Sequence, residues 1–265
     1  MTALSAYIDG LSVIGPALAD WPVAEAVLAG RAAYAPGPTV VPPPLALPAA
    51  ERRRTGLSVK LAIAAGLEAA GRAGLDARSL LTVFTSSGGD GENCHEICQT
   101  LATTDRQLSP TRFHNSVHNA PAGYWSIATG AMAASTALCA YDASFAAGLL
   151  EAVTQVVVDR SPVLLIAYDT GYPPPLRQKR PLTDCFGAAF VLAPARGPRS
   201  LARLTVGLSD RSADSMPQAQ LERLRLGTPA GRSLPLLALI ARRAPAAVHV
   251  EYFGPASLRA EIEPC

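Results

Sequence analysis

Apolar residues recur with two different spacings along the chain, and each spacing predicts one kind of element. Apolar positions three and four residues apart are typical of amphipathic helices, whereas short runs that are apolar throughout are typical of buried strands. A proline-rich stretch at residues 36–48 cannot form a regular helix and is expected to be an extended connection. The predicted helices cover residues 18–30, 49–74, 92–104, 118–134, 142–159 and 235–244, and the predicted strands cover residues 6–15, 80–87, 135–141, 162–169, 187–194, 202–210, 246–254 and 257–264.

The order of these elements predicts the fold class. Strands and helices alternate through the middle of the chain, and the strands are apolar on both faces. This pattern favours an α/β architecture in which helices cover both faces of a mostly parallel sheet.

Composition limits the possible functions. The chain has 265 residues, of which 49% are hydrophobic and 17% charged, with a formal net charge of +2. A nucleic-acid partner has little support, because no basic run alternates with aromatic residues. The N-terminal residues lack the pattern of a signal peptide, and no apolar run approaches the roughly 18 residues of a membrane span, so we expect a cytoplasmic protein without a membrane span. The cysteines are expected to be reduced and buried: Cys94, Cys98, Cys139, Cys185 and Cys265.

Several segments carry a resemblance to a known family. In order, they are RRRTGLSVKLAIAAGLEAAGRAGL, LLTVFTSSGGDG, NAPAGYWSIATG, STALCAYDAS, PVLLIAYDTG and FGAAFVLA. Together they resemble the N-terminal half of a β-ketoacyl synthase. The resemblance implies a thiolase-like layered fold, with one near-complete N-terminal half at residues 1–199 and a shortened C-terminal remnant at residues 200–265 packed on the same domain.

The resemblance also locates the family's nucleophile position. Ketoacyl synthases carry an approximate S-T-A-C-A-S-G motif, in which the cysteine accepts the acyl group. Counting from Ala122-Gly123-Tyr124 places that cysteine at Asp142 and the glycine of the motif at Phe145. We interpret Asp142 as an N-cap of the following helix or as a polar remnant of an acyl site, because a carboxylate is a poor nucleophile toward a thioester. Cys139 is expected to be a buried strand residue, with a displaced nucleophile as the alternative.

The C-terminal part departs further from the family. Ketoacyl synthases use two histidines, in H-G-T-G-T and near G-F-G-G-T-N, and a lysine from their second half. None of the four histidines here precedes a glycine, and no lysine follows Lys179. We therefore expect no catalytic residue, no cofactor and no condensation by this chain alone.

Other clusters allow alternative roles. Cys94, His95 and Cys98, with His114 and His118 further on, could hold zinc, but small residues on one helix face favour packing and we expect no metal. His118 and Asn119 are expected to cap a helix or contact its preceding loop, with a partner contact as the alternative. Residues 52–54, all arginine, predict a solvated or interface surface, with an acyl carrier protein as a possible partner.

These features favour a non-catalytic subunit similar to a chain length factor. The resemblance is to the short form that accompanies synthases of aryl polyene pigments, which implies a heterodimer with an active β-ketoacyl synthase and contact with an acyl carrier protein through that complex. The expected tunnel and interface positions are Cys94, Ile97, Cys98, Leu101, Phe113, His118, Asn119 and Phe145. On a helix, the first four of these form one apolar stripe that faces either the core or a tunnel. Two alternatives remain: an acyl-thioester-binding or hydrolytic enzyme using Cys139 or Asp142, and a homodimeric scaffold or carrier-binding module.

Overall fold

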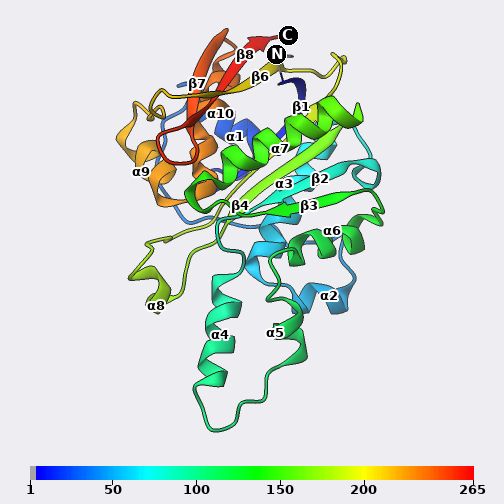
Figure 1. Ribbon diagram of the computed structural model, residues 1–265, viewed down its shortest axis with the longest axis vertical. Coiled ribbons are helices and arrows are strands. Elements are labelled where there is room, and N and C mark those ends of the chain that lie inside the picture. Colours follow the sequence, from blue (N-terminus) through cyan, green and yellow to red (C-terminus); the bar gives the residue numbers. More distant parts are fainter. Residues whose placement is uncertain (1–3) are drawn as a thin grey trace.

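The computed structural model describes residues 4–265 and joins eight strands in one sheet, in the order β3-β2-β4-β5-β1-β6-β8-β7 (Figure 1). The strands are β1 (Leu4–Ile14), β2 (Leu81–Thr85), β3 (Ser135–Leu138), β4 (Val163–Asp169), β5 (Phe186–Ala193), β6 (Ala202–Ser209), β7 (Ala246–Glu251) and β8 (Ser257–Pro264). The helices are α1 (Trp21–Leu28), α2 (Ala49–Arg54), α3 (Leu57–Ala73), α4 (Gly91–Leu101), α5 (Pro110–His114), α6 (Ala120–Thr129), α7 (Ser144–Asp159), α8 (Pro174–Arg177), α9 (Ala219–Gly227) and α10 (Leu234–Arg242), with short 3-10 turns η1 (Ala77–Ser79), η2 (Tyr141–Ala143) and η3 (Pro229–Ser233).

The layered α/β architecture is confirmed, but the sheet is mixed and not mostly parallel. Strand β2 runs parallel to β3 and β4, whereas every other neighbouring pair is antiparallel. Strands that run parallel in one sheet need a crossover connection, and helix α7 provides it from β3 to β4, which lie on either side of β2. Strands β7 and β8 are joined directly by a short connection, which forces an antiparallel pair.

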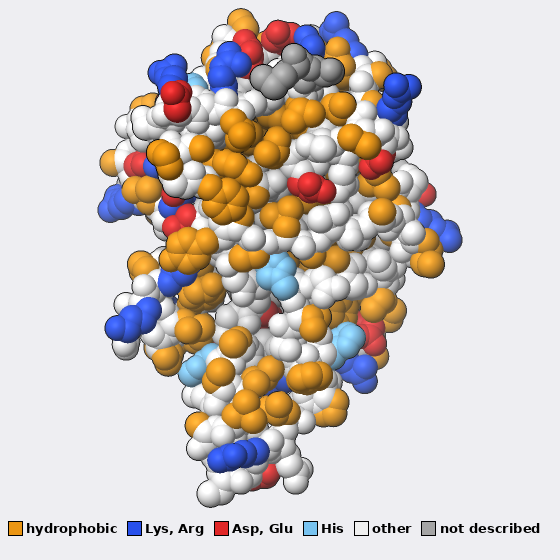
Figure 2. Space-filling view, viewed as in Figure 1, with side chains coloured by type: hydrophobic (Ala, Val, Ile, Leu, Met, Phe, Trp, Pro, Cys, Tyr) orange, Lys and Arg blue, Asp and Glu red, His pale blue; other side chains and the backbone are white. Residues whose placement is uncertain are grey.

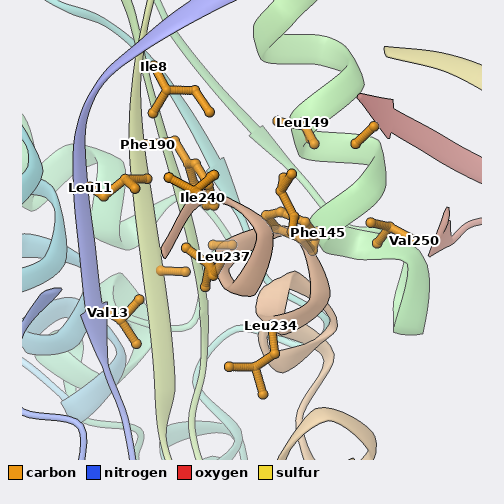
Figure 3. Close-up of a cluster of buried hydrophobic side chains, with 14 of the residues drawn as sticks. Ile8, Leu11, Val13, Phe145, Leu149, Phe190, Leu234, Leu237, Ile240 and Val250 are labelled. Carbon is orange, nitrogen blue, oxygen red and sulfur yellow. The ribbon is translucent and has the colours of Figure 1, made fainter. Parts of the chain in front are cut away.

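Helices cover both faces of the sheet. On one face, α3 and α6 contribute to a core that includes Ile166 and Trp125. On the other face, α1 and α7 pack over β1, and α10 packs over β7 and β8. Figure 3 shows this core, in which the rings of Phe145 of α7 and Phe190 of β5 have a centroid distance of 5.7 Å. Strand β4 is buried at every position, which explains its continuous apolar run.

The long helix predicted at residues 49–74 is divided into α2 and α3 at Thr55 and Gly56. A side chain at Gly56 would place its Cβ 2.1 Å from the Oδ2 atom of Asp90, so the break lets the turn before α4 approach closely. Asp90 then caps α4 by accepting a hydrogen bond from the Asn93 backbone N–H.

Helices α4 and α5, with residues 102–109 between them, form a projecting arm that extends from the body of the molecule (Figure 1). At the opposite end, β6, β8 and β7 extend the sheet beyond β1. The interpretation of residues 200–265 as a shortened second half stays a prediction. Within residues 4–265, none of the helices has the length and apolar character needed to traverse a lipid bilayer.

The candidate site at the elbow before helix α7

A tight turn joins β3 to α7 and presents Asp142 at the bend. Strand β3 ends at Leu138, and the 3-10 turn η2 leads directly into α7. Tyr141 has φ of 54°, a left-handed conformation that is uncommon outside glycine. The hydroxyl of Ser144 donates to the Tyr141 carbonyl at 2.7 Å and accepts from the Ala140 N–H at 3.0 Å, which stabilises this sharp reversal. We call residues 139–144 the elbow.

The carboxylate of Asp142 binds Arg180 and does not cap helix α7. Its Oδ1 atom accepts a hydrogen bond from Arg180 Nη2 at 2.8 Å, and the guanidinium carbon lies 3.5 Å from the centroid of the Tyr141 ring. The N-cap residue of α7 is Ala143, without a side-chain hydrogen bond. The N-cap prediction for Asp142 is therefore wrong, because a charge-assisted pair with a partner from a distant segment competes with the local cap.

Cys139 is exposed, and the prediction that it is a buried strand residue is wrong. It follows the last residue of β3, and β3 lies at the edge of the sheet with alternating exposed positions. Its thiol contacts the Ser87 carbonyl oxygen at 3.2 Å.

A buried carboxylate lies behind the elbow, at the end of β4. Asp169 is 2% exposed, and its Oδ1 atom accepts from the Ser87 N–H at 2.9 Å and the Ser87 hydroxyl at 2.7 Å. Its Oδ2 atom accepts from the Ala230 N–H at 2.8 Å. Burial raises the pKa of Asp169, although these hydrogen bonds oppose the shift. Asp169 is not among the residues predicted from the sequence, where its only signal is an acidic residue at the end of an apolar strand.

His118 and Asn119 lie at the start of α6 and behave differently. The Nε2 atom of His118 lies 3.1 Å from the Ser86 carbonyl oxygen, so this side chain contacts the turn after β2. Asn119 occupies the N-cap position but makes no side-chain cap bond. Phe145, expected at the tunnel or interface, is fully buried against Phe190 and so lies in the core of this chain.

The apolar stripe of α4 is largely exposed and does not pack in the core of this chain. Cys94 and Cys98 are exposed, Ile97 is half-buried, and Leu101 is 45% exposed. Phe113 on α5 is 66% exposed, and Figure 2 shows hydrophobic side chains gathered over the arm. The core-packing interpretation of this stripe is therefore wrong for the chain by itself.

The expectation that the five cysteines are buried is wrong for four of them, which are exposed. Only Cys185 is buried among the five, and burial raises the pKa of its thiol. Among residues 4–265, no three His, Cys, Asp or Glu side chains are grouped so that they could hold a metal ion.

A cavity of about 520 Å³ lies beside the base of the arm, between α2, α4 and α5. Arg53, Arg54 and Arg112 line it together with Asp90 and Glu92. Arg53 and Arg54 are exposed and Arg52 is half-buried, which agrees with the expectation of a surface role for residues 52–54.

Taken together, the mixed sheet, the two helical layers and the strand–turn–helix elbow define a thiolase-like fold. A family model described as "Beta-ketoacyl synthase, N-terminal domain" matches residues 29–234. The chain therefore belongs to the β-ketoacyl synthase family.

Solved structures agree on the fold. The chain matches one in a complex of the ketosynthase ApeO with its chain length factor ApeC from Xenorhabdus doucetiae, at 24% identity and a TM-score of 0.74, covering 97% of this chain and 99% of that one. It matches the ishigamide ketosynthase/chain length factor at 15% identity and a TM-score of 0.75, covering 98% and 99% of the two chains. It also matches the AntDE:AntF complex of a type II acyl carrier protein with its ketosynthase, at 12% identity and a TM-score of 0.77, covering 98% and 99%. A comparison with curated proteins gives no match.

Proposed function

We propose that this chain is a non-catalytic subunit similar to a chain length factor, and that it pairs with an active β-ketoacyl synthase in type II polyketide biosynthesis of the aryl polyene kind. The elbow carries this proposal. The position that the family motif assigns to the acyl-accepting cysteine holds Asp142, whose carboxylate is engaged by Arg180 at 2.8 Å. An ion-paired carboxylate is a poor nucleophile toward a thioester, so this chain would not accept the acyl group itself.

The free edge of the sheet supports a protein partner. The carbonyl oxygens of Ala134 and Leu138 each accept a hydrogen bond from a backbone N–H group, one in β2 and one in the residue that follows β2. Because backbone groups alternate in direction along a strand, those of the intervening Ala137 point away from β2. Met132, just before β3, is 93% exposed. An unpaired strand edge beside apolar surface is a template for pairing with another chain, and we propose that the synthase covers it.

The exposed stripe on α4 supports the tunnel-shaping role. Cys94 and Cys98 are exposed and have small side chains, and Phe113, on the neighbouring helix of the arm, is 66% exposed. In the heterodimer that we propose, this surface closes the far end of the partner's acyl tunnel. The size of the side chains on the stripe would then limit product length.

The cavity at the base of the arm supports a role for an acyl carrier protein. Arg53, Arg54 and Arg112 line it, and Arg54 and Arg112 form exposed ion pairs with Glu51 and Glu96 at 3.5 and 3.3 Å, which an acidic partner could replace. We propose that a carrier protein contacts this region in the assembled complex.

Two alternatives have specific support. The exposed thiol of Cys139 favours an enzyme that accepts acyl groups, and the uncovered edge of β3 is equally compatible with a homodimeric scaffold.

Co-expression of the full chain with a type II β-ketoacyl synthase, followed by native mass spectrometry, should give a one-to-one heterodimer. A stable homodimer in the presence of the synthase would support the scaffold and contradict our proposal.

Acyl transfer separates the remaining alternative. Incubation of the heterodimer with an acyl carrier thioester, followed by intact-mass spectrometry, should place the acyl group on the synthase and leave this chain unmodified. Cys139→Ser is the matched control. A stable adduct on the wild-type chain that disappears in this variant would identify an acyl-accepting enzyme and overturn the non-catalytic assignment.

A further inference from the structure

Residues 170–185, between β4 and β5, form an excursion that reaches the elbow. The Tyr172 N–H donates to the Leu182 carbonyl at 2.9 Å and closes the base of the excursion. Residues 174–179, which include α8, are exposed, whereas Pro173 and Leu182 are buried. Arg180 is the residue of this segment that forms an ion pair with the elbow.

The Arg180 side chain is mostly buried and makes two contacts with the elbow. Its side chain is 15% exposed, and it both donates to Asp142 at 2.8 Å and covers the face of the Tyr141 ring at 3.5 Å. Tyr141 has a left-handed backbone conformation, and its ring lies against the guanidinium. Asp142 itself lies in the first turn of η2, which runs directly into the 16-residue helix α7, so the helix dipole favours negative charge at the same place.

We propose that the elbow is a carboxylate-binding site, built from Arg180, Tyr141 and the start of α7, that Asp142 occupies from within the chain. This occupancy holds residues 170–185 against the elbow. The chemical class of ligand follows from the geometry: a small carboxylate can replace the Asp142 side chain, whereas a neutral amide of the same shape cannot form the ion pair.

Hydrogen exchange of the full chain tests the effect on the segment. In Asp142→Ala, amide exchange in a peptide spanning residues 170–185 should be about three- to tenfold faster than in the wild type. This factor is smaller than for a fully buried ion pair, because the Arg180–Asp142 pair is partly exposed. Arg180→Gln should have the same effect. Asp159→Ala, at the exposed far end of α7, is the matched control and should leave the segment unchanged.

Chemical rescue tests the site itself. Acetate should slow the exchange of residues 170–185 in Asp142→Ala in a saturable way, acetamide should not, and acetate should have no effect in Arg180→Gln. If Asp142→Ala does not fold, Asp142→Ser, whose side chain also leaves room for acetate, serves in its place. Wild-type exchange rates in the folded variants, or equal protection by acetamide, would overturn the proposal. Because neither a synthase nor a carrier takes part, these outcomes are independent of the proposed heterodimer.

Discussion

Replacement of Asp142 by cysteine should create a reactive thiol that still does not catalyse condensation. The variant introduces a thiol at the position that we propose for the family's acyl-accepting cysteine, at the N-terminal side of α7 and beside Arg180. A thiolate there would gain the attraction of the guanidinium and of the helix N-terminus. We therefore expect the introduced thiol to have a pKa below its ordinary value.

The magnitude follows from the geometry of the existing pair. Two unit charges about 4 Å apart interact by about 4 kcal/mol at an effective dielectric constant of about 20. The Asp142 side chain is 36% exposed, which reduces this to about 2 kcal/mol and lowers the thiol pKa from about 8.5 to about 7. At pH 7 the thiolate fraction would rise from about 3% to about 50%, while the intrinsic nucleophilicity would fall about four- to sixfold. Alkylation at pH 7 should therefore be about three- to fourfold faster than for an ordinary thiol.

The assay is the pH dependence of iodoacetamide alkylation, followed by peptide mass spectrometry in a Cys139→Ser background that removes the nearby exposed thiol. Adding Arg180→Gln should raise the thiol pKa again. A midpoint at or above about 8.5 that Arg180→Gln leaves unchanged would refute the electrostatic reasoning. Carbon dioxide release from malonyl thioester should stay at background, because a nucleophile supplies only one step of condensation; release well above background would refute the non-catalytic assignment.

Three further changes test other parts of the molecule. Ala137→Pro should leave the chain folded but weaken synthase binding about tenfold or more in a titration. Ala247→Pro, on the edge strand at the opposite end of the sheet, should leave synthase binding unchanged. Equal binding of the synthase by the two variants would contradict the role of β3. Cys98→Phe should shorten carrier-bound products by mass spectrometry while changing the free energy of unfolding by less than about 0.5 kcal/mol, and Gln99→Phe, beside the stripe, should leave product length unchanged. Asp169→Asn should cost about 1–3 kcal/mol of stability, because an amide N–H₂ would face a backbone or hydroxyl donor. Because the pKa of Asp169 is higher in the folded state than in the unfolded state, this group stabilises the fold fully below about pH 4, and the stabilisation is lost as pH rises through the folded-state pKa. Denaturation at several pH values should show this pH dependence of the free energy of unfolding in the wild type and not in Asp169→Asn.

The sequence predicted best those elements whose burial is complete. Strand β4 is buried at every position, and its apolar run indicated a strand without ambiguity. The helical spacing after the elbow likewise predicted α7, which buries Phe145 and Leu149 in the core. In contrast, the division of residues 49–74 into two helices depends on the approach of Asp90 to Gly56, a contact between segments that no local pattern records.

The candidate site was harder to predict for the same reason. The motif spacing placed Asp142 at a bend, but its partner lies 38 residues later in the chain, so the local expectation of an N-cap could not include Arg180. The spacing of Cys94, Ile97, Cys98 and Leu101 specified one apolar face without specifying what covers it. Amphipathic periodicity is the same for a core helix and for a helix that meets another chain, and only the projection of the arm from the body distinguishes the two.

The elbow keeps the physical features that would stabilise an anionic nucleophile. A sharp turn presents residue 142 before a long helix, an arginine lies within hydrogen-bond distance, and Tyr141 adopts the left-handed conformation that allows both. These features favour negative charge whether a sulfur or a carboxylate carries it. A carboxylate satisfies the same electrostatic environment without the reactivity of a thiolate, so the framework of an acyl site can persist after the chemistry has been lost. If residue 142 takes the place of the family's acyl-accepting cysteine, as we propose, an aspartate there preserves the charge that the fold favours and changes the atom that carries it from sulfur to oxygen.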